Sequence, residues 1–121
     1  MASYKDLDVF KRSYELALKI HRFSFVLPKE LQYDIADQIR RASRSIPSNI
    51  AEGYGRNKSF KDKINFLNSA LGSNEEVLFN LKFLKDSGLI CEKDFQDFHK
   101  EYIICGKQLT QLIKSLKPKT N

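Results

Sequence analysis

Serine, asparagine, glutamate and histidine are the side chains of this 121-residue chain whose types could support catalysis. Candidates from two separate stretches are Ser45, Ser48, Asn49, Glu52, Ser73, Glu75 and Glu76. A nucleophilic serine needs a base such as histidine, held in turn by a third group. His21 and His99 both lie far from these stretches in the sequence, and His21 falls beside an apolar stripe, which favours packing. We therefore expect no catalytic residue and no enzyme.

The sequence also lacks the motifs that are typical of metal-dependent and phosphate-binding sites. A di-metal carboxylate centre in a helical bundle uses paired Glu-x-x-His motifs, which this chain does not contain. The stretch "EGYGR" matches neither GxxxxGK[ST] nor GxGxxG after a strand. We expect no metal ion and no cofactor.

Basic side chains are the second chemical feature. Lys and Arg number 21 against 15 Asp and Glu, which gives a net charge of +6 and favours an anionic partner. Between residues 40 and 58 only Glu52 opposes five basic residues, Arg40, Arg41, Arg44, Arg56 and Lys58. Such a face can neutralise phosphates and release counterions regardless of sequence. It could equally pair with Asp34 or Asp37 of another subunit, or be solvated.

Base-stacking aromatic residues are absent from this basic stretch apart from Tyr54, so sequence-specific recognition of single strands is not supported.

Four helical segments must position these residues. Four helices are predicted over about 6–26, 29–53, 60–87 and 92–116. The prediction rests on apolar periodicity and on the start and stop signals Pro28, Ser59 with Asp62, and Gly88. The fourth segment shows a heptad seam, and no stretch alternates as a strand would. Short connections predict one all-α domain, 1–121, folded as an antiparallel up-down-up-down four-helix bundle. Pro47 removes a backbone hydrogen bond, so we expect it to kink the second helix.

The first segment carries two opposed apolar stripes. One contains Leu7, Phe10, Tyr14, Ala17, Leu18 and Phe25, and the other contains Val9, Leu16, Ile20 and Phe23. A surface helix of a monomer normally buries one stripe. We interpret the second as a candidate oligomer interface, with a helix wedged between neighbours in its own chain as the alternative.

Small and polar residues around Pro47 suggest a buried polar cluster. Asn49 and Glu52 lie three apart on one face, and Gly72 with Ser73 allows close backbone approach in the third segment. We expect a structural cluster of Asn49, Glu52, Ser73 and Glu76, whose groups must be paired if buried.

Two cysteines, Cys91 and Cys105, show no CxxC spacing. The stretch "MASYKDLDVF" lacks the apolar run of a signal peptide, and no segment approaches the length of a membrane span. We expect reduced thiols, a cytoplasmic protein and no membrane contact.

Two longer motifs, "QIRRASRSIPSNIAEGYGR" and "NFLNSALGSNEE", resemble a known family. The family comprises four-helix bundle proteins encoded in intervening sequences of bacterial large-subunit ribosomal RNA genes, some of which carry a ribosomal-protein name. The shared pattern falls on 38–42, 45–53 and Ala70, Gly72, Ser73 and Glu76, and "KDLDVFKRSYELALKIHR" is also similar. The resemblance implies an antiparallel protomer, a homopentamer and an unsettled biochemical role. Distant relatives are the accessory variability proteins of retroelements, which bind nucleic acid.

Together these observations predict a non-enzymatic, homo-oligomeric bundle that binds RNA or DNA through its basic surface, largely independently of sequence. The alternative is an interaction scaffold whose arginines contact an acidic partner protein, of unknown identity, or a neighbouring subunit.

Overall fold

The structure, a computed structural model that describes residues 3–55 and 57–117, is all-α. Within these residues it contains four α-helices and no strands, as expected. The helices are α1 (Asp8–Ser24), α2 (Ile35–Gly53), α3 (Phe60–Asp86) and α4 (Glu92–Leu116), and two 3-10 turns are η1 (Tyr4–Asp6) and η2 (Lys29–Leu31).

The second helix begins later than residue 29. Residues 29–31 form the separate turn η2, whose Leu31 N–H bonds to the Pro28 carbonyl, and Asp34 has a non-helical backbone before α2 starts. Pro28 precedes η2 with a non-helical backbone (φ −51°, ψ 147°), and Asp34 separates this turn from α2.

Side chains and one glycine set the ends of α3 and α4. Ser59 Oγ accepts the Asp62 N–H while the Asp62 carboxylate accepts the Ser59 N–H, which is a full capping box. Gly88 has a φ of +73°, a left-handed conformation that glycine adopts without a steric penalty, just after α3 ends. Cys91 caps α4 by accepting the Asp94 N–H at its sulfur.

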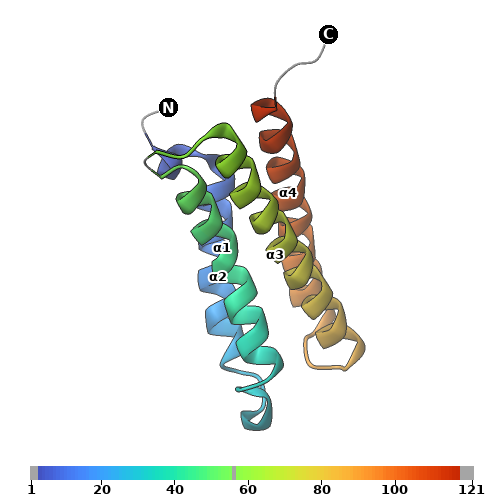
Figure 1. The fold of residues 1–121 in the computed structure, drawn as a ribbon. Coiled ribbons are helices and arrows are strands. Elements are labelled where there is room, and N and C mark those ends of the chain that lie inside the picture. The colour runs from blue at the N-terminus through green and yellow to red at the C-terminus, as the bar shows by residue number, and fades with distance from the viewer. Residues whose placement is uncertain (1–2, 56, 118–121) are drawn as a thin grey trace.

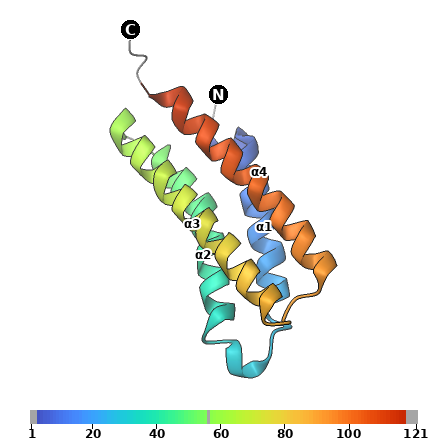
Figure 2. The ribbon, with the colours of Figure 1, turned by 90° about the vertical axis from the view of Figure 1, so that its right-hand side faces the viewer.

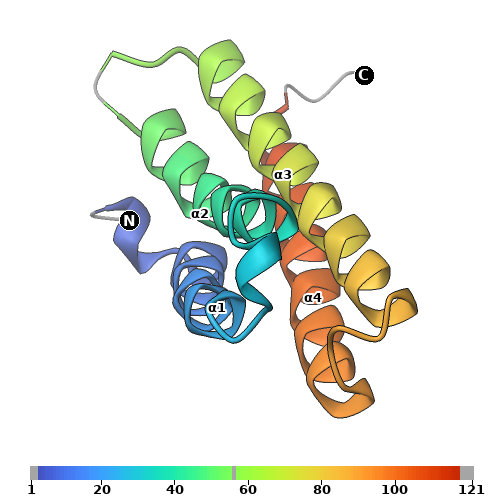
Figure 3. The ribbon, with the colours of Figure 1, turned by 90° about the horizontal axis from the view of Figure 1, so that it is seen from below.

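The helices form two neighbouring pairs, α1 with α2 and α3 with α4, and α2 packs against α3 (Figures 1 and 3). The connections from α1 to α2 and from α3 to α4 lie at one end of the bundle. The start of α3 and the end of α4 lie together at the other end (Figure 2). No helix in the described part of the chain has the length and apolar character needed to cross a bilayer.

The prediction that Val9, Leu16, Ile20 and Phe23 of α1 form an outer, subunit-binding stripe is wrong. Val9, Leu16 and Ile20 are buried inside this single chain, and the Phe23 ring packs edge-on against Phe98, so these four do not form an outer face for a second copy. The opposite stripe is the more outward one, because Tyr14, Leu18 and Phe25 are exposed, although its Ala17 is buried and its Leu7 and Phe10 are half-buried against the core. The inward stripe also includes two fully buried serines, Ser13 and Ser24, whose hydroxyls bond to carbonyls three residues back.

Two asparagines of α3 are also buried in the core. Asn74 is fully enclosed and donates from Nδ2 to the Tyr102 carbonyl of α4 at 2.9 Å. The Tyr102 ring is itself fully buried, and burial raises the pKa of its hydroxyl. Asn80 lies further along α3 and is 2% exposed. The core is therefore mainly apolar but also contains buried serine, asparagine and tyrosine side chains.

Candidate nucleic-acid interface

Arg40, one of the five basic residues that the sequence assigned to a phosphate-binding face, does not project freely into solvent. Its guanidinium donates to Ser24 Oγ at 2.7 Å and to the side-chain and main-chain oxygens of Gln32 at 3.1 and 2.8 Å, and it lies over the Phe25 ring. Gln32 in turn donates to the Ser24 and Leu27 carbonyls. Arg40 thus ties the connection between α1 and α2 together, and its donors are committed there.

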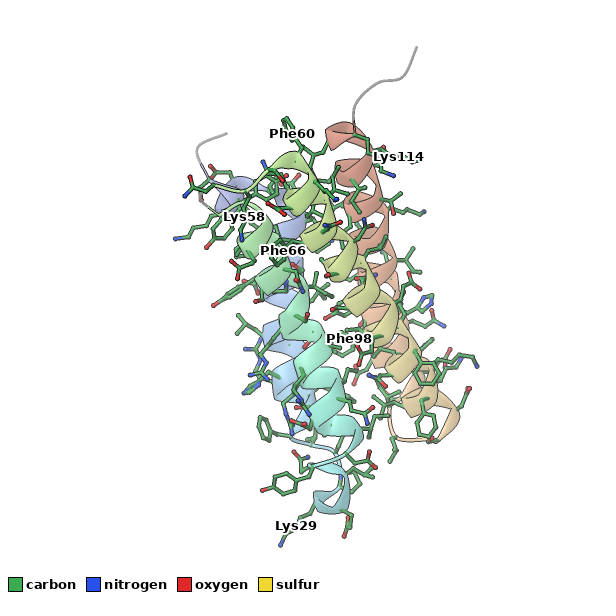
Figure 4. The ribbon with its side chains drawn as sticks, in the orientation of Figure 1. Lys29, Lys58, Phe60, Phe66, Phe98 and Lys114 are labelled. Atoms are coloured by element: carbon green, nitrogen blue, oxygen red, sulfur yellow. The ribbon has the colours of Figure 1, made fainter. Side chains whose placement is uncertain are left out.

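The other predicted basic residues are more accessible. Arg44 is exposed, while Arg41 is exposed and paired with Asp37 on the preceding turn at 3.0 Å. Lys58 is half-buried, with Nζ 3.9 Å from Glu52 and 4.8 Å from the centre of the Phe66 ring (Figure 4). Arg56 lies outside the described residues. The structure therefore does not gather these residues into one patch with Arg40.

A cluster of lysines and aromatic rings occurs where α2 gives way to α3. Lys63 Nζ lies 4.4 Å from the centre of the Tyr54 ring and 5.8 Å from that of Phe60. Both distances are within the range of a cation–π contact. Phe60 is 67% exposed at the first position of α3, next to exposed Lys61. The alternation of lysine and phenylalanine over residues 58–66 is the sequence signal that could have identified this cluster.

Charge is unevenly distributed along the α3 and α4 pair. Residues 53–74 contain four basic residues and one acid, and residues 102–121 contain four basic residues and no acid. Residues 75–101, between them, contain four basic residues and seven acids. Because α3 begins and α4 ends at the same end of the bundle, the described lysines near these two helix ends lie at that end (Figures 2 and 4). We call this region the basic end and define it by the described residues Lys58, Lys61, Lys63, Lys114 and Lys117.

The expected polar cluster forms only in part. Ser73 Oγ of α3 donates to Ser45 Oγ of α2 at 2.9 Å, and Asn49 donates to the Ser45 hydroxyl and carbonyl. Glu52 and Glu76 are exposed, so they are not members of a buried cluster. Glu76 lines a shallow groove that also includes Gln38 and Arg41.

The neighbouring Gly72 does not serve the expected close approach of helices. A Cβ built on it would meet no atom of the described chain within 4 Å. By contrast, a Cβ on Gly106 in α4 would meet Asn74 Nδ2 at 3.2 Å.

An apolar groove runs between α1 and α2 and has a volume of about 480 Å³. It is lined mainly by the outward stripe of α1, including Phe10, Tyr14 and Leu18, and by Arg44 and Pro47 of α2. Tyr14 is 51% exposed, so much of the ring faces water.

Of the side chains considered for catalysis, Ser45, Asn49 and Ser73 are hydrogen-bonded together, and His21 and Ser48 both line the groove between α1 and α2. The His21 ring contacts Phe25 edge-on and the His99 ring stacks on Phe95, so each histidine lies beside a phenylalanine. Within residues 3–55 and 57–117 no group of three or more His, Cys, Asp or Glu side chains could hold a metal ion. Cys91 is exposed and Cys105 is buried, both as free thiols, and burial raises the pKa of Cys105 to about 12.

The chain is similar to a described protein family and to solved structures. A family model described as 23S rRNA-intervening sequence protein matches residues 5–111. A crystal structure of a protein of unknown function from the S23 ribosomal protein family, from Bacteroides thetaiotaomicron VPI-5482, superposes with a TM-score of 0.79 and 28% sequence identity. The match covers 88% of this chain and 95% of that one. No curated protein has a matching sequence.

Proposed function

Because the chain belongs to the family of 23S rRNA-intervening sequence proteins, we propose that it is a non-enzymatic helical bundle that binds RNA or DNA through a basic surface. The resemblance of its two motifs to this family is thereby confirmed, and the remainder of the proposal rests on the chain's own charges. Binding is largely independent of sequence, since phosphate contacts carry no base information.

The observation that carries this proposal is the basic end. The net charge of segments 53–74 and 102–121 together is more positive than the net charge of the whole chain, because the remaining residues are net acidic. Lys61, Lys114 and Lys117 are exposed. Concentrated positive charge on a rigid surface neutralises several phosphates at once and releases their counterions, which is the main source of non-specific affinity.

The proposed surface includes Arg41 and Arg44 of α2 in addition to Lys58 and the other lysines of the basic end. Arg41 and Arg44 are exposed, and the contact of Lys58 with Glu52 is long enough to be exchanged for a phosphate. We exclude Arg40, because breaking its bonds to Ser24 and Gln32 would cost stability in the α1–α2 connection.

The test is a charge-deletion variant with a matched control. Replacing Lys61, Lys114 and Lys117 by Ala should weaken binding of RNA and of duplex DNA, and should reduce the slope of log K against log salt by about one for each lysine that had neutralised a phosphate. The control replaces Lys82, Lys93 and Lys100 by Ala, which removes equal charge from the same two helices outside the basic end. An unchanged salt slope in the first variant, or an equal decrease in the control, would reject the proposal.

We also propose a homo-oligomer, a pentamer by the family resemblance, assembled through the outward stripe of α1. The apolar groove beside α2, with Tyr14 and Leu18 exposed in it, supports this. Replacing Leu18 by Glu should lower the mass measured by light scattering, whereas the same change at exposed Phe79 should not. The proposed oligomer is contradicted if the unmodified chain is a monomer, or if replacing Leu18 leaves the measured mass unchanged.

A scaffold function is the second candidate, favoured by the acidic segment 75–101. The basic end of one copy is complementary in charge to this segment in another, or to an acidic partner protein. Purification without nuclease discriminates between the two functions. Co-purifying nucleic acid supports the first, and protein that is free of nucleic acid and binds none at low salt supports the second.

For the fold itself we propose antiparallel, up-down-up-down helices with α2 bent at Pro47. Short connections and a proline inside a continuous helix support these two features. We further propose a cytoplasmic bacterial protein, with Cys91 and Cys105 reduced and no cofactor.

A further inference from the structure

We propose that Phe60, with Tyr54 and the lysines around them, forms a stacking platform for unpaired bases, so that the basic end binds single-stranded nucleic acid in preference to duplex. This inference rests on the proposed function and specifies its ligand. RNA and DNA strands share the required chemistry, a polyanionic backbone with flat aromatic bases.

The exposure of Phe60 is the first observation. Its side chain is 67% exposed although it stands at the most basic part of the surface. Phe66, further along α3, is half-buried and its ring already lies beside Lys58 Nζ. Phe60 therefore offers the accessible ring, whereas Phe66 is less exposed and already in contact with Lys58.

Lysines flank the ring and provide the charge complementarity. Lys63 Nζ lies 4.4 Å from the centre of the Tyr54 ring and 5.8 Å from that of Phe60, and Lys61, which follows Phe60, is exposed. A base stacked on Phe60 would place its phosphates near these ammonium groups. Proteins that bind single strands without sequence preference combine aromatic platforms with a basic groove in this way.

The backbone under the platform is fixed. Ser59 and Asp62 cap α3 through two reciprocal hydrogen bonds, of 3.1 and 3.2 Å, so the chain around Phe60 has a defined geometry. Asp62 is the one acid in this turn, and its carboxylate is engaged with the Ser59 N–H, which lowers its pKa. The platform is therefore preorganised, which reduces the entropic cost of binding.

The experiment compares oligouridine, oligothymidine and a duplex of the same length with the full chain and its Phe60 variants. Phe60→Ala and Phe60→Leu should weaken binding of both single strands by about 5- to 100-fold, since leucine keeps the apolar bulk but lacks a ring face. Phe60→Trp should retain the affinity. Duplex affinity and the salt slope should stay unchanged in all three variants, because no charge is altered and paired bases cannot reach the ring.

Phe79→Ala is the matched control, because Phe79 is 66% exposed on the same helix but lies outside the basic end. If Phe60→Ala binds single strands as the unmodified chain does, while the lysine variant is weakened, the platform is rejected and the proposed function stands. If no nucleic acid binds at all, both are rejected. If polyglutamate binds and Phe60→Ala weakens it equally, the ring serves a protein partner and the platform is again rejected.

Discussion

Replacing Gly72 by Ala tests whether the outer face of α3 is free in the folded chain. Gly72 is exposed in the interior of a 27-residue helix, and a Cβ at this position would meet nothing within 4 Å. Glycine costs roughly 0.5–1 kcal/mol relative to alanine inside a helix, because its backbone loses more freedom on folding. We expect the variant to be more stable than the unmodified chain by about this amount.

Gly106→Ala is the matched comparison, since it gains the same helical propensity. Its added methyl group would lie 3.2 Å from Asn74 Nδ2, and Asn74 is fully buried and bonded to the Tyr102 carbonyl. Displacing this amide would weaken a buried hydrogen bond, at a cost of about 1–3 kcal/mol. The two alanine variants should therefore differ in stability by about this amount, with Gly72→Ala the more stable.

Urea unfolding followed by circular dichroism, at several protein concentrations, measures both effects. Concentration matters because association contributes to the apparent stability. A Gly72→Ala variant less stable than the unmodified chain at every concentration would refute the reasoning that this face is free. Stabilisation accompanied by a lower oligomer mass would instead show that another subunit approaches α3 at Gly72.

Three further predictions concern a helix cap, the half-buried Arg40 and the two thiols. Ser59→Ala should cost about 1 kcal/mol in urea unfolding, because the side-chain cap of α3 is removed. The lowered pKa of Asp62 stabilises the fold at higher pH, and this contribution disappears as the pH falls through the folded-state pKa. Ser59→Ala should flatten this acid side of the pH–stability profile only in part, because it removes the side-chain contact of Ser59 but keeps the Ser59 N–H, whose bond to Asp62 is the main cause of the lowered pKa. Arg40→Ala should lower the unfolding free energy by about 1–3 kcal/mol while leaving the salt slope of nucleic-acid binding unchanged. Cys91 should react with a thiol reagent in the native state, whereas Cys105 should react only on unfolding, because it is buried and its pKa is raised to about 12.

Each of these has a clear contrary result. An unaltered pH profile in Ser59→Ala would show that the Ser59 side chain does not contribute to the lowered pKa of Asp62. A reduced salt slope in Arg40→Ala would restore this arginine to the phosphate-binding surface. Equal native reactivity of both thiols would show that the core around Cys105 opens readily.

Sequence periodicity located α4 well but misassigned the faces of α1. The apolar residues of α4 follow a single seam, so only one face can be buried. On α1 two stripes compete, and the decisive residues are Ser13 and Ser24, which lie with Val9 and Ile20 on the inward face. A serine that bonds back to its own helix carries no unpaired polar group into the core, so it packs as a small residue. When such a serine is treated as polar in the periodicity, the stripe that faces the core is therefore missed.

The candidate site was predictable only where its chemistry is local. The capping pair Ser59 and Asp62 is three residues apart and is identifiable from spacing alone. The contacts of Arg40 depend on Ser24 and Gln32, across a connection whose path the sequence does not specify. Lys63 reaches Tyr54 only because the chain turns between α2 and α3, so this contact became visible only in the structure.

The bond from Asn74 to the Tyr102 carbonyl has a consequence for how α3 and α4 are aligned. Leucine seams permit a helix to slide past its neighbour by one turn while still burying similar area. Here such a slip would separate the amide from the one carbonyl that it bonds, and would bring a side chain where Gly106 now leaves room. A single polar contact therefore selects one register for a helix pair that leucines alone would leave ambiguous.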